Sequence, residues 1–195
     1  MKLELQSRVT KAHLDFDMGV EFEDSSSVAF SEFELGGVLY DEDNQFDGLR
    51  ALVGLLGRTC TRAKVSPSSV LELDFDDGSR VMAKPRDEVE SWEYTAANGS
   101  TMICLPEGDI ESMPRPFRHI PPAVTAGPPS EGATVVKISV GQDSGIEFSD
   151  RTVLRTDVPL DSAYLILRES VVSSHLIEKR QQIELSSGYF LPLDG

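Results

Sequence analysis

The sequence predicts a mainly β protein, with antiparallel sheets built from three related hairpin units and one short helix. Three observations support this fold class. Apolar and polar residues alternate with a period of two in many short runs, these runs are rich in β-branched and aromatic residues, and Asp-Gly or Asp-Ser steps follow several of them. Such alternation is typical of strands with one buried face, and the steps favour tight turns between antiparallel neighbours.

A short pattern centred on a phenylalanine occurs three times. The stretches MGVEFEDSSSVAF (18–30), LELDFDDGSRVMA (71–83) and SGIEFSDRTVLRT (144–156) align on Phe22, Phe75 and Phe148. An aliphatic residue stands two positions before each Phe, an Asp stands two positions after it, and another alternating run precedes each copy. We therefore expect three related units, each made of strand, turn, strand, turn and strand, with the three Phe rings in the core.

Carboxylates alternate with the core residues of the second copy. Leu71, Leu73 and Phe75 are expected to face the core, because successive side chains leave opposite faces of a strand. The other face of the strand is then a row of carboxylates, and the first copy has a similar arrangement. The carboxylates expected to point outward from these two copies, and to bind a partner, are Glu21, Glu23, Glu72, Asp74 and Asp76.

One helix and one connector interrupt the β pattern. In QFDGLRALVGLLGRT the leucines recur at helical spacing, which predicts a short helix over about residues 47–56, with Asp47 capping its start and Gly57 ending it. Residues 113–130 contain 6 of the 11 prolines and no periodicity, which favours an extended connector. We expect a β-rich region over 1–112 with the first two copies and another over 131–195 with the third.

Composition restricts the kind of partner. The 195 residues include 39% hydrophobic residues, enough for a packed core, and 18 Lys and Arg against 33 Asp and Glu give a net charge of -15. This charge disfavours binding to nucleic-acid phosphates or to an anionic membrane surface, and favours a basic protein partner. Residues 1–57 carry 4 basic and 12 acidic side chains and residues 58–112 carry 6 and 11, so these two segments are expected to contribute most to the attraction.

The sequence contains neither a recognisable secretory leader nor a membrane span. The run MKLELQSRVT has no long apolar stretch, and no later stretch approaches the roughly 20 apolar residues that a spanning helix needs. We therefore expect a cytoplasmic protein. Cys60 and Cys104 are expected to be free thiols, because the cytoplasm keeps thiols reduced.

Catalytic, metal-binding and cofactor-binding motifs are not found in the sequence. The acidic stretches DFDDG and DEDNQFDG do not place Gly and Glu where a calcium loop needs them. His13, His119 and His175 lack the paired spacing of a zinc site, and no nucleophile elbow, phosphate loop or dinucleotide fingerprint occurs. We therefore expect a binding protein rather than an enzyme, with no catalytic residues, no metal and no cofactor.

Several features of the middle third of the chain resemble a bacterial family of small β-rich proteins of unknown function. These features are the turn at Asp77 and Gly78, the Pro and acidic residues over 85–90, Trp92, a second turn at Gly99, and the Cys-Leu-Pro sequence over 104–106. The chain departs from the pattern at Glu107, where the resemblance implies Gly. Small acidic proteins of this kind are similar to immunity proteins, which neutralise polymorphic toxins.

These observations predict a non-enzymatic acidic protein that neutralises a basic protein partner, as an immunity protein inhibits a bacterial toxin domain. An acidic surface complements the Lys and Arg with which such an effector holds an anionic substrate, and it speeds association. One alternative is a nucleic-acid mimic or scaffold protein, and another is a β-barrel-like enzyme or ligand carrier with an internal site. A dedicated inhibitor is expected to have an aromatic anchor beside its charges, which a mimic does not need.

Overall fold

The computed structural model describes residues 1–114, 128–142, 144–155, 171–177, 180–186 and 190–193. The predicted mainly β fold is confirmed, because strands account for 48% of the chain and the described residues contain one α-helix. The chain divides into two compact units, Met1–His119 and Ile120–Gly195. This division falls within the predicted connector, of which residues 115–127 lie outside the described residues, so the predicted domain bounds stay a prediction.

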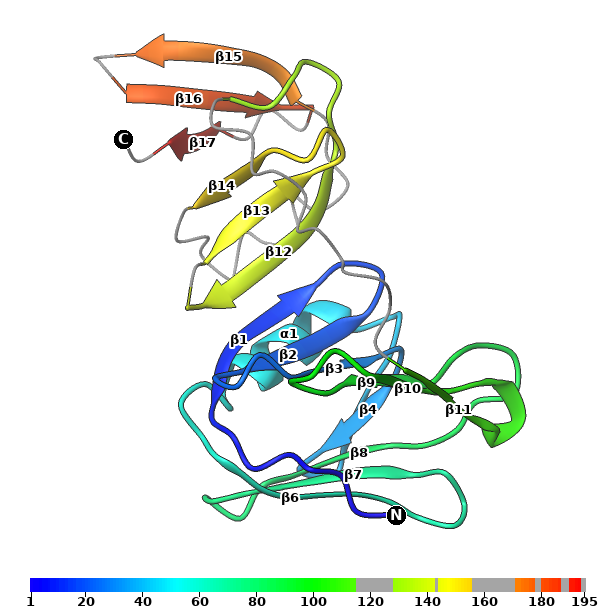
Figure 1. The fold of residues 1–195 in the computed structure, drawn as a ribbon. Helices are drawn as coiled ribbons and strands as arrows, with labels where there is room; N and C mark the ends of the chain where they lie inside the picture. The colour runs from blue at the N-terminus through cyan, green and yellow to red at the C-terminus, as the bar shows by residue number, and fades with distance from the viewer. Residues whose placement is uncertain (115–127, 143, 156–170, 178–179, 187–189, 194–195) are drawn as a thin grey trace. The chain divides into compact units, whose positions relative to one another are not determined.

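Two antiparallel sheets form the first unit (Figure 1). The strands of one sheet are, in spatial order, β11 (Ile110–Met113), β10 (Thr101–Cys104), β9 (Trp92–Thr95), β3 (Ser27–Phe30), β2 (Met18–Phe22) and β1 (Val9–Leu14). The strands of the other sheet are β5 (Val38–Tyr40), β4 (Phe33–Leu35), β8 (Arg80–Ala83), β7 (Leu71–Phe75) and β6 (Cys60–Val65).

Contacts between the two sheets enclose the core of this unit. The rings of Phe30 in β3 and Phe33 in β4 have centroids 5.3 Å apart. The indole N–H of Trp92 in β9 donates a hydrogen bond of 3.0 Å to the carbonyl of Ser69, just before β7. All three apolar residues of β7 are buried, as its alternation predicts.

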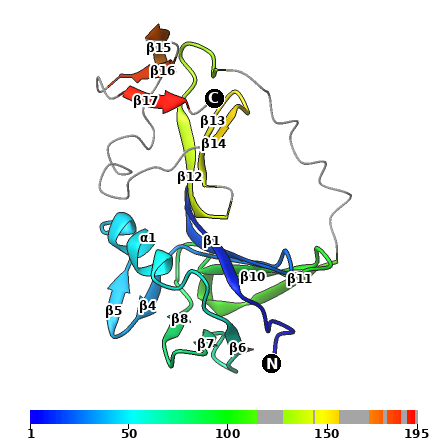
Figure 2. The same cartoon turned by 90° about the vertical axis from the view of Figure 1, so that its left-hand side faces the viewer.

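The helix α1 (Gln45–Val53) contacts β1 and β2 and lies beside them in Figures 1 and 2. It begins and ends earlier than the predicted 47–56. The predicted cap by Asp47 is wrong: Asn44 is the N-cap residue, and Asp47 lies in the first turn, where it accepts a hydrogen bond of 3.1 Å from Arg50. Beyond Val53 the chain continues as hydrogen-bonded turns as far as Gly57, which has a φ of +79°.

The N-terminal segment, residues 1–8, connects the two sheets. It runs antiparallel to β6, where Lys2 lies opposite Lys64 in an isolated bridge. The side chain of Leu5 is fully buried. From the other sheet, the hydroxyl of Tyr94 in β9 donates a hydrogen bond of 3.2 Å to the carbonyl of Glu4. One segment without regular secondary structure thus bonds to both sheets.

Six strands are described in the second unit. The strands β12 (Val135–Gly141), β13 (Gly145–Phe148) and β14 (Val153–Arg155) pair antiparallel in chain order, and so do β15 (Val171–Ile177), β16 (Arg180–Leu185) and β17 (Phe190–Leu193). The third copy of the phenylalanine pattern lies on β13 and β14, and β12 is the alternating run that precedes it.

Three hairpins, β1–β2, β6–β7 and β12–β13, have the same break in strand register. In each, one extra residue in the first strand forms a β-bulge close to the residue that pairs with the phenylalanine. Two of the extra residues are threonines whose hydroxyls donate to the carbonyl just before the phenylalanine, at 3.3 Å for Thr10 and 3.1 Å for Thr61. The register shifts lie between Val9 and Lys11, Cys60 and Arg62, and Val135 and Lys137.

The same turn follows the phenylalanine in each of these hairpins. Phe22, Phe75 and Phe148 are all buried, and each backbone N–H donates to the carbonyl four residues later. The Asp two positions after each Phe accepts a hydrogen bond from the N–H of the Ser or Thr that closes the turn. The residue between them has a positive φ, +70° at Ser25, +86° at Gly78 and +70° at Arg151. That the three units are related stays a prediction.

Candidate functional site

The five carboxylates expected to bind a partner lie in two settings. Glu21, Glu72 and Asp74 are half-buried on strands, whereas Glu23 and Asp76 are exposed in the turns that follow β2 and β7. Glu21 and Glu23 belong to β2 and the turn after it, in one sheet. The other three belong to β7 and the turn after it, in the second sheet. Their suitability for binding therefore differs between positions.

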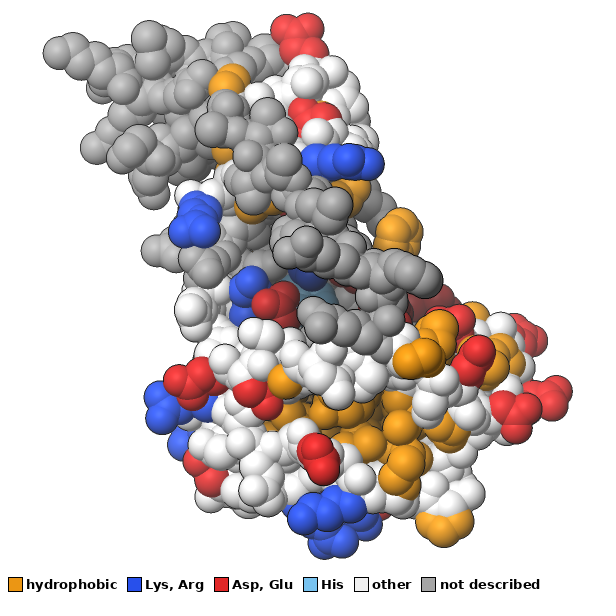
Figure 3. All heavy atoms as spheres, in the orientation of Figure 1, with side chains coloured by type: hydrophobic (Ala, Val, Ile, Leu, Met, Phe, Trp, Pro, Cys, Tyr) orange, Lys and Arg blue, Asp and Glu red, His pale blue; other side chains and the backbone are white. Residues whose placement is uncertain are grey.

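Basic residues on neighbouring strands balance the strand carboxylates of β7. Glu72 lies 2.9 Å from Lys64 of β6 and 4.0 Å from Arg80 of β8, and Arg80 also pairs with Asp74. Figure 3 likewise shows acidic and basic side chains next to one another on the first unit. This face is mixed in charge, because the partners of one strand's carboxylates come from the two strands that flank it.

The β1–β2 hairpin contains a similar ion pair just after its bulge. Lys11 lies directly opposite Glu21, and their charged groups are 3.0 Å apart. The corresponding opposite residues in the β6–β7 hairpin are Arg62 and Asp74. There, however, the carboxylate of Asp74 is bound by Arg80 from β8.

An exposed aromatic side chain lies at the tip of the β1–β2 hairpin. Phe16 is 83% exposed, more than any other large hydrophobic residue among those described. Its turn is well bonded: the N–H of Asp17 donates to Oδ1 of Asp15 at 2.9 Å, and the side-chain amide of Gln45 donates to the carbonyl of Phe16 at 3.5 Å. The backbone is therefore held in place while the ring remains in solvent.

Four carboxylates gather at this tip. The pKa of Asp17 is raised, mainly by burial and further by the negative charges of Asp15, Glu90 and Glu93. Asp15, Glu90 and Glu93 are therefore each near enough to Asp17 for their charges to act on it. The strand register explains why, because Met18 pairs with Phe30 and Phe30 pairs with Trp92, at the same end of three adjacent strands. We call Asp15, Phe16, Asp17, Glu90 and Glu93 the Phe16 tip.

The Phe16 tip was not identified from the sequence. Phe16 ends the alternating run RVTKAHLDF, where an aromatic residue is expected to be buried, and no Gly or Pro marks the turn. The signal that the sequence offers for this turn is Asp15. An Asp side chain in a turn often accepts a hydrogen bond from the backbone N–H two residues later, here that of Asp17.

Metal binding and thiol chemistry find no support in the described residues. No three His, Cys, Asp or Glu side chains of the described part are placed to hold a metal ion. His13 is buried in β1, whereas His119 lies outside the described residues. Cys60 and Cys104 are free, as expected, and buried. Burial raises the pKa of Cys60 to about 11 and also raises that of Cys104, so both thiols are protonated at neutral pH.

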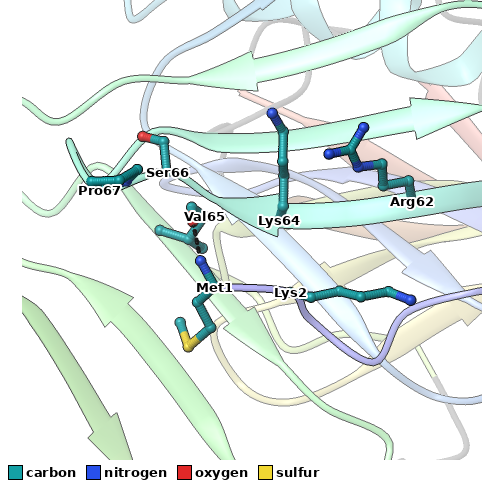
Figure 4. A pocket seen from close by; sticks show the side chains of 7 residues that line it. All are labelled: Met1, Lys2, Arg62, Lys64, Val65, Ser66 and Pro67. Atoms are coloured by element: carbon teal, nitrogen blue, oxygen red, sulfur yellow. Dashed lines mark hydrogen bonds between the residues drawn. The ribbon is translucent and has the colours of Figure 1, made fainter.

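Two pockets border the N-terminal segment. One, of about 370 Å³, is lined by Met1, Lys2, Arg62, Lys64, Val65, Ser66 and Pro67 (Figure 4). The other, of about 600 Å³, is lined by Lys2, Leu3, Glu4, Leu5, Gln6 and Asp24.

The fold and the site define a mainly β protein in which the first unit presents an acidic, aromatic hairpin tip. The chain belongs to a family of unknown function (DUF6188), whose model matches residues 1–114. The match covers all the described residues of the first unit, more than the middle third in which the resemblance was seen. No curated protein and no solved structure matches the chain significantly. No helix in the described part of the chain is long and apolar enough to cross a membrane.

Proposed function

We propose that the protein is a non-enzymatic, acidic binding protein that neutralises a basic protein partner. The partner we propose is a bacterial toxin domain, inhibited in the cytoplasm in the manner of an immunity protein. The observation that carries this proposal is the Phe16 tip, where a phenylalanine that is 83% exposed stands between Asp15 and Asp17 and the charges of Glu90 and Glu93 act on Asp17.

Binding of a basic partner would relieve two unfavourable features of the Phe16 tip, which are the exposed ring of Phe16 and the repulsion at Asp17. The ring of Phe16 loses its contact with water on binding, and aromatic residues that become fully buried supply much of the binding free energy at protein interfaces. Lys or Arg side chains of a partner would relieve the repulsion at Asp17 and would also be attracted to the face of the ring. A basic surface with an apolar pocket therefore complements the tip in both respects.

The exposed ring favours a dedicated inhibitor over a nucleic-acid mimic. A mimic places rows of carboxylates where phosphates would lie, whereas three of the five carboxylates first expected to bind are already paired with Lys or Arg. The combination of one aromatic anchor with a local cluster of charge is typical of a specific interface.

The carboxylates outside the tip are proposed to contribute to association in proportion to their exposure. Glu23 and Asp76 form no ion pair with any described residue and lie in exposed turns, so they act on the rate at which a basic partner arrives. Glu21, Glu72 and Asp74 contribute less, because neighbouring bases cancel much of their field.

The test measures association with the purified product of the gene immediately upstream. Phe16→Ala is expected to weaken binding by about 2 kcal/mol, mainly through faster dissociation, because it removes the anchor. Val38→Ala is the matched control, since it shortens another exposed apolar side chain of the first unit. Glu23→Lys combined with Asp76→Lys is expected to slow association and to reduce its dependence on salt.

Two binding results would contradict the proposal. One is a complex that tolerates Phe16→Ala as well as it tolerates Val38→Ala, which would remove the tip from the interface. The other is an association rate that does not respond to salt or to charge reversal, which would show that the carboxylates are merely solvated. A turnover activity of the purified protein alone would contradict its non-enzymatic character.

A further inference from the structure

The pocket of about 370 Å³ beside β6 gathers positive charge in a strongly acidic chain (Figure 4). Two of its lining side chains, Arg62 and Lys64, come from β6, and Lys2 comes from the N-terminal segment. Figure 4 shows Arg62 and Lys64 next to one another along the strand. The net charge of the chain is -15, so three cations around one pocket oppose its overall charge.

The arrangement of these cations is unfavourable in itself. Lys2 lies directly opposite Lys64 in an antiparallel bridge, and like charges in opposite positions destabilise a pair of strands. Arg62 stands two residues before Lys64, so both side chains leave the same face of β6. Three positive side chains are therefore brought together by strand geometry.

Carboxylates compensate only part of this charge. Lys64 is paired with Glu72 at 2.9 Å. Arg62 holds the position in β6 that Lys11 holds in β1. Lys11 forms an ion pair with Glu21, which lies opposite it, whereas Asp74, which lies opposite Arg62, is bound by Arg80. Neither Arg62 nor Lys2 forms an ion pair with any residue that the structure describes. Glu4, on the same segment as Lys2, lines the neighbouring pocket and not this one.

The walls of the pocket are apolar. They consist of Pro67, the side chain of Met1 and the aliphatic stems of the basic residues, whereas Val65, which also lines the pocket, is only 3% exposed. The terminal ammonium of Met1 donates a hydrogen bond to the carbonyl of Val65. Lys2 and Arg62 supply the lining cations whose side chains form no ion pair with a described residue.

We infer that this pocket binds a small amphipathic anion, a carboxylate with an apolar body. The carboxylate interacts with Lys2 and with the guanidinium of Arg62, whose fork of donors matches a carboxylate in geometry. The apolar body packs against Pro67 and the side chain of Met1. This site is independent of the Phe16 tip and of the basic partner proposed for it.

The experiment titrates the whole chain with octanoate and follows binding by calorimetry. Saturable binding is expected, and Arg62→Gln and Lys2→Gln should each weaken it about tenfold, as expected for the loss of a hydrogen bond between charged groups. Arg8→Gln is the matched control, because it removes one positive charge from the same segment without touching the pocket. Thermal unfolding without ligand shows that each variant folds.

Two further probes separate the parts of the proposed ligand. Octan-1-ol has the same body without charge, and acetate has the charge without the body, so both are expected to bind far more weakly than octanoate. The inference is overturned by the absence of saturable octanoate binding, by equal affinity for octanoate and either probe, or by equal affinity in Arg62→Gln and Arg8→Gln. Phe16→Ala should leave octanoate binding unchanged, which separates this site from the proposed partner surface.

Discussion

Gly19 lies directly opposite His13 across the β1–β2 pair, and the imidazole ring occupies the space that a side chain at position 19 would need. A Cβ atom there would lie 2.5 Å from Nε2 of His13 and 2.8 Å from the carbonyl oxygen of Val28. Gly19→Ala is therefore expected to lower the free energy of unfolding by about 1–3 kcal/mol, as overpacking does. Urea denaturation monitored by circular dichroism measures the change.

The contribution of the ring to this clash can be isolated. A His13→Ala background removes the two closest contacts of a Cβ at position 19 and keeps the carbonyl of Val28, so Gly19→Ala should cost less there than in the natural chain. An equal cost in both backgrounds would show that the imidazole moves aside freely.

Phe75→Ala is expected to lower the free energy of unfolding by about 3–5 kcal/mol, because the ring is buried in the core of the first unit. Phe16→Ala removes the same group from the exposed hairpin tip and is expected to change stability by less than about 0.5 kcal/mol. Both values come from chemical denaturation. A large loss of stability in Phe16→Ala would show that this ring packs against the protein.

Glu107 adopts a φ of +64°, in the left-handed region that favours glycine, at the position where the family resemblance implies Gly. Glu107→Gly is expected to raise the free energy of unfolding by about 0.5–1 kcal/mol, since the strain of a Cβ in this conformation exceeds the entropy that glycine adds to the unfolded chain. Glu107→Ala is the control, because it removes the same charge and keeps the Cβ. An equal gain in both variants would assign the effect to charge.

Asp17→Asn is expected to stabilise the free protein at neutral pH. Burial, with the charges of Asp15, Glu90 and Glu93, raises the pKa of Asp17 in the folded state, so its ionised form is disfavoured by folding. Below the ordinary carboxyl pKa, Asp17 is protonated in both the folded and the unfolded state, so this loss of stability is absent. The loss develops as the pH rises from the ordinary pKa through the raised pKa of Asp17.

Unfolding by urea across the range from acidic to neutral pH tests this sign. The advantage of Asp17→Asn should grow as the pH rises, while Asp43→Asn, at an exposed carboxylate outside the tip, should show little change. A variant that is less stable than the natural chain at neutral pH would show that the Asp17 carboxylate is favourable in the fold.

The burial of β7 and of the three phenylalanines could be predicted because it depends on local alternation, which the sequence displays directly. The mixed charge of the outer face of β7 could not be predicted, because Lys64 and Arg80 are brought to its carboxylates only by strand pairing. Phe16 could not be distinguished from a core aromatic residue, because its exposure depends on where the hairpin turns. The start of α1 was missed because Asn44 is bonded into the preceding turn, where its Oδ1 accepts from the N–H of Asp41.

Residues 1–8 are expected to join the first unit late in its folding. The hydrogen bonds from Gln6 to Thr61 and from Met1 to Val65 join residues 55 and 64 positions apart, whereas the hairpins close over a few residues. Loop closure makes the distant contacts slower to form than the local ones. We therefore expect this segment to dock after β6 and β7 have paired, and a chain still emerging from the ribosome to expose Leu3 and Leu5 until then.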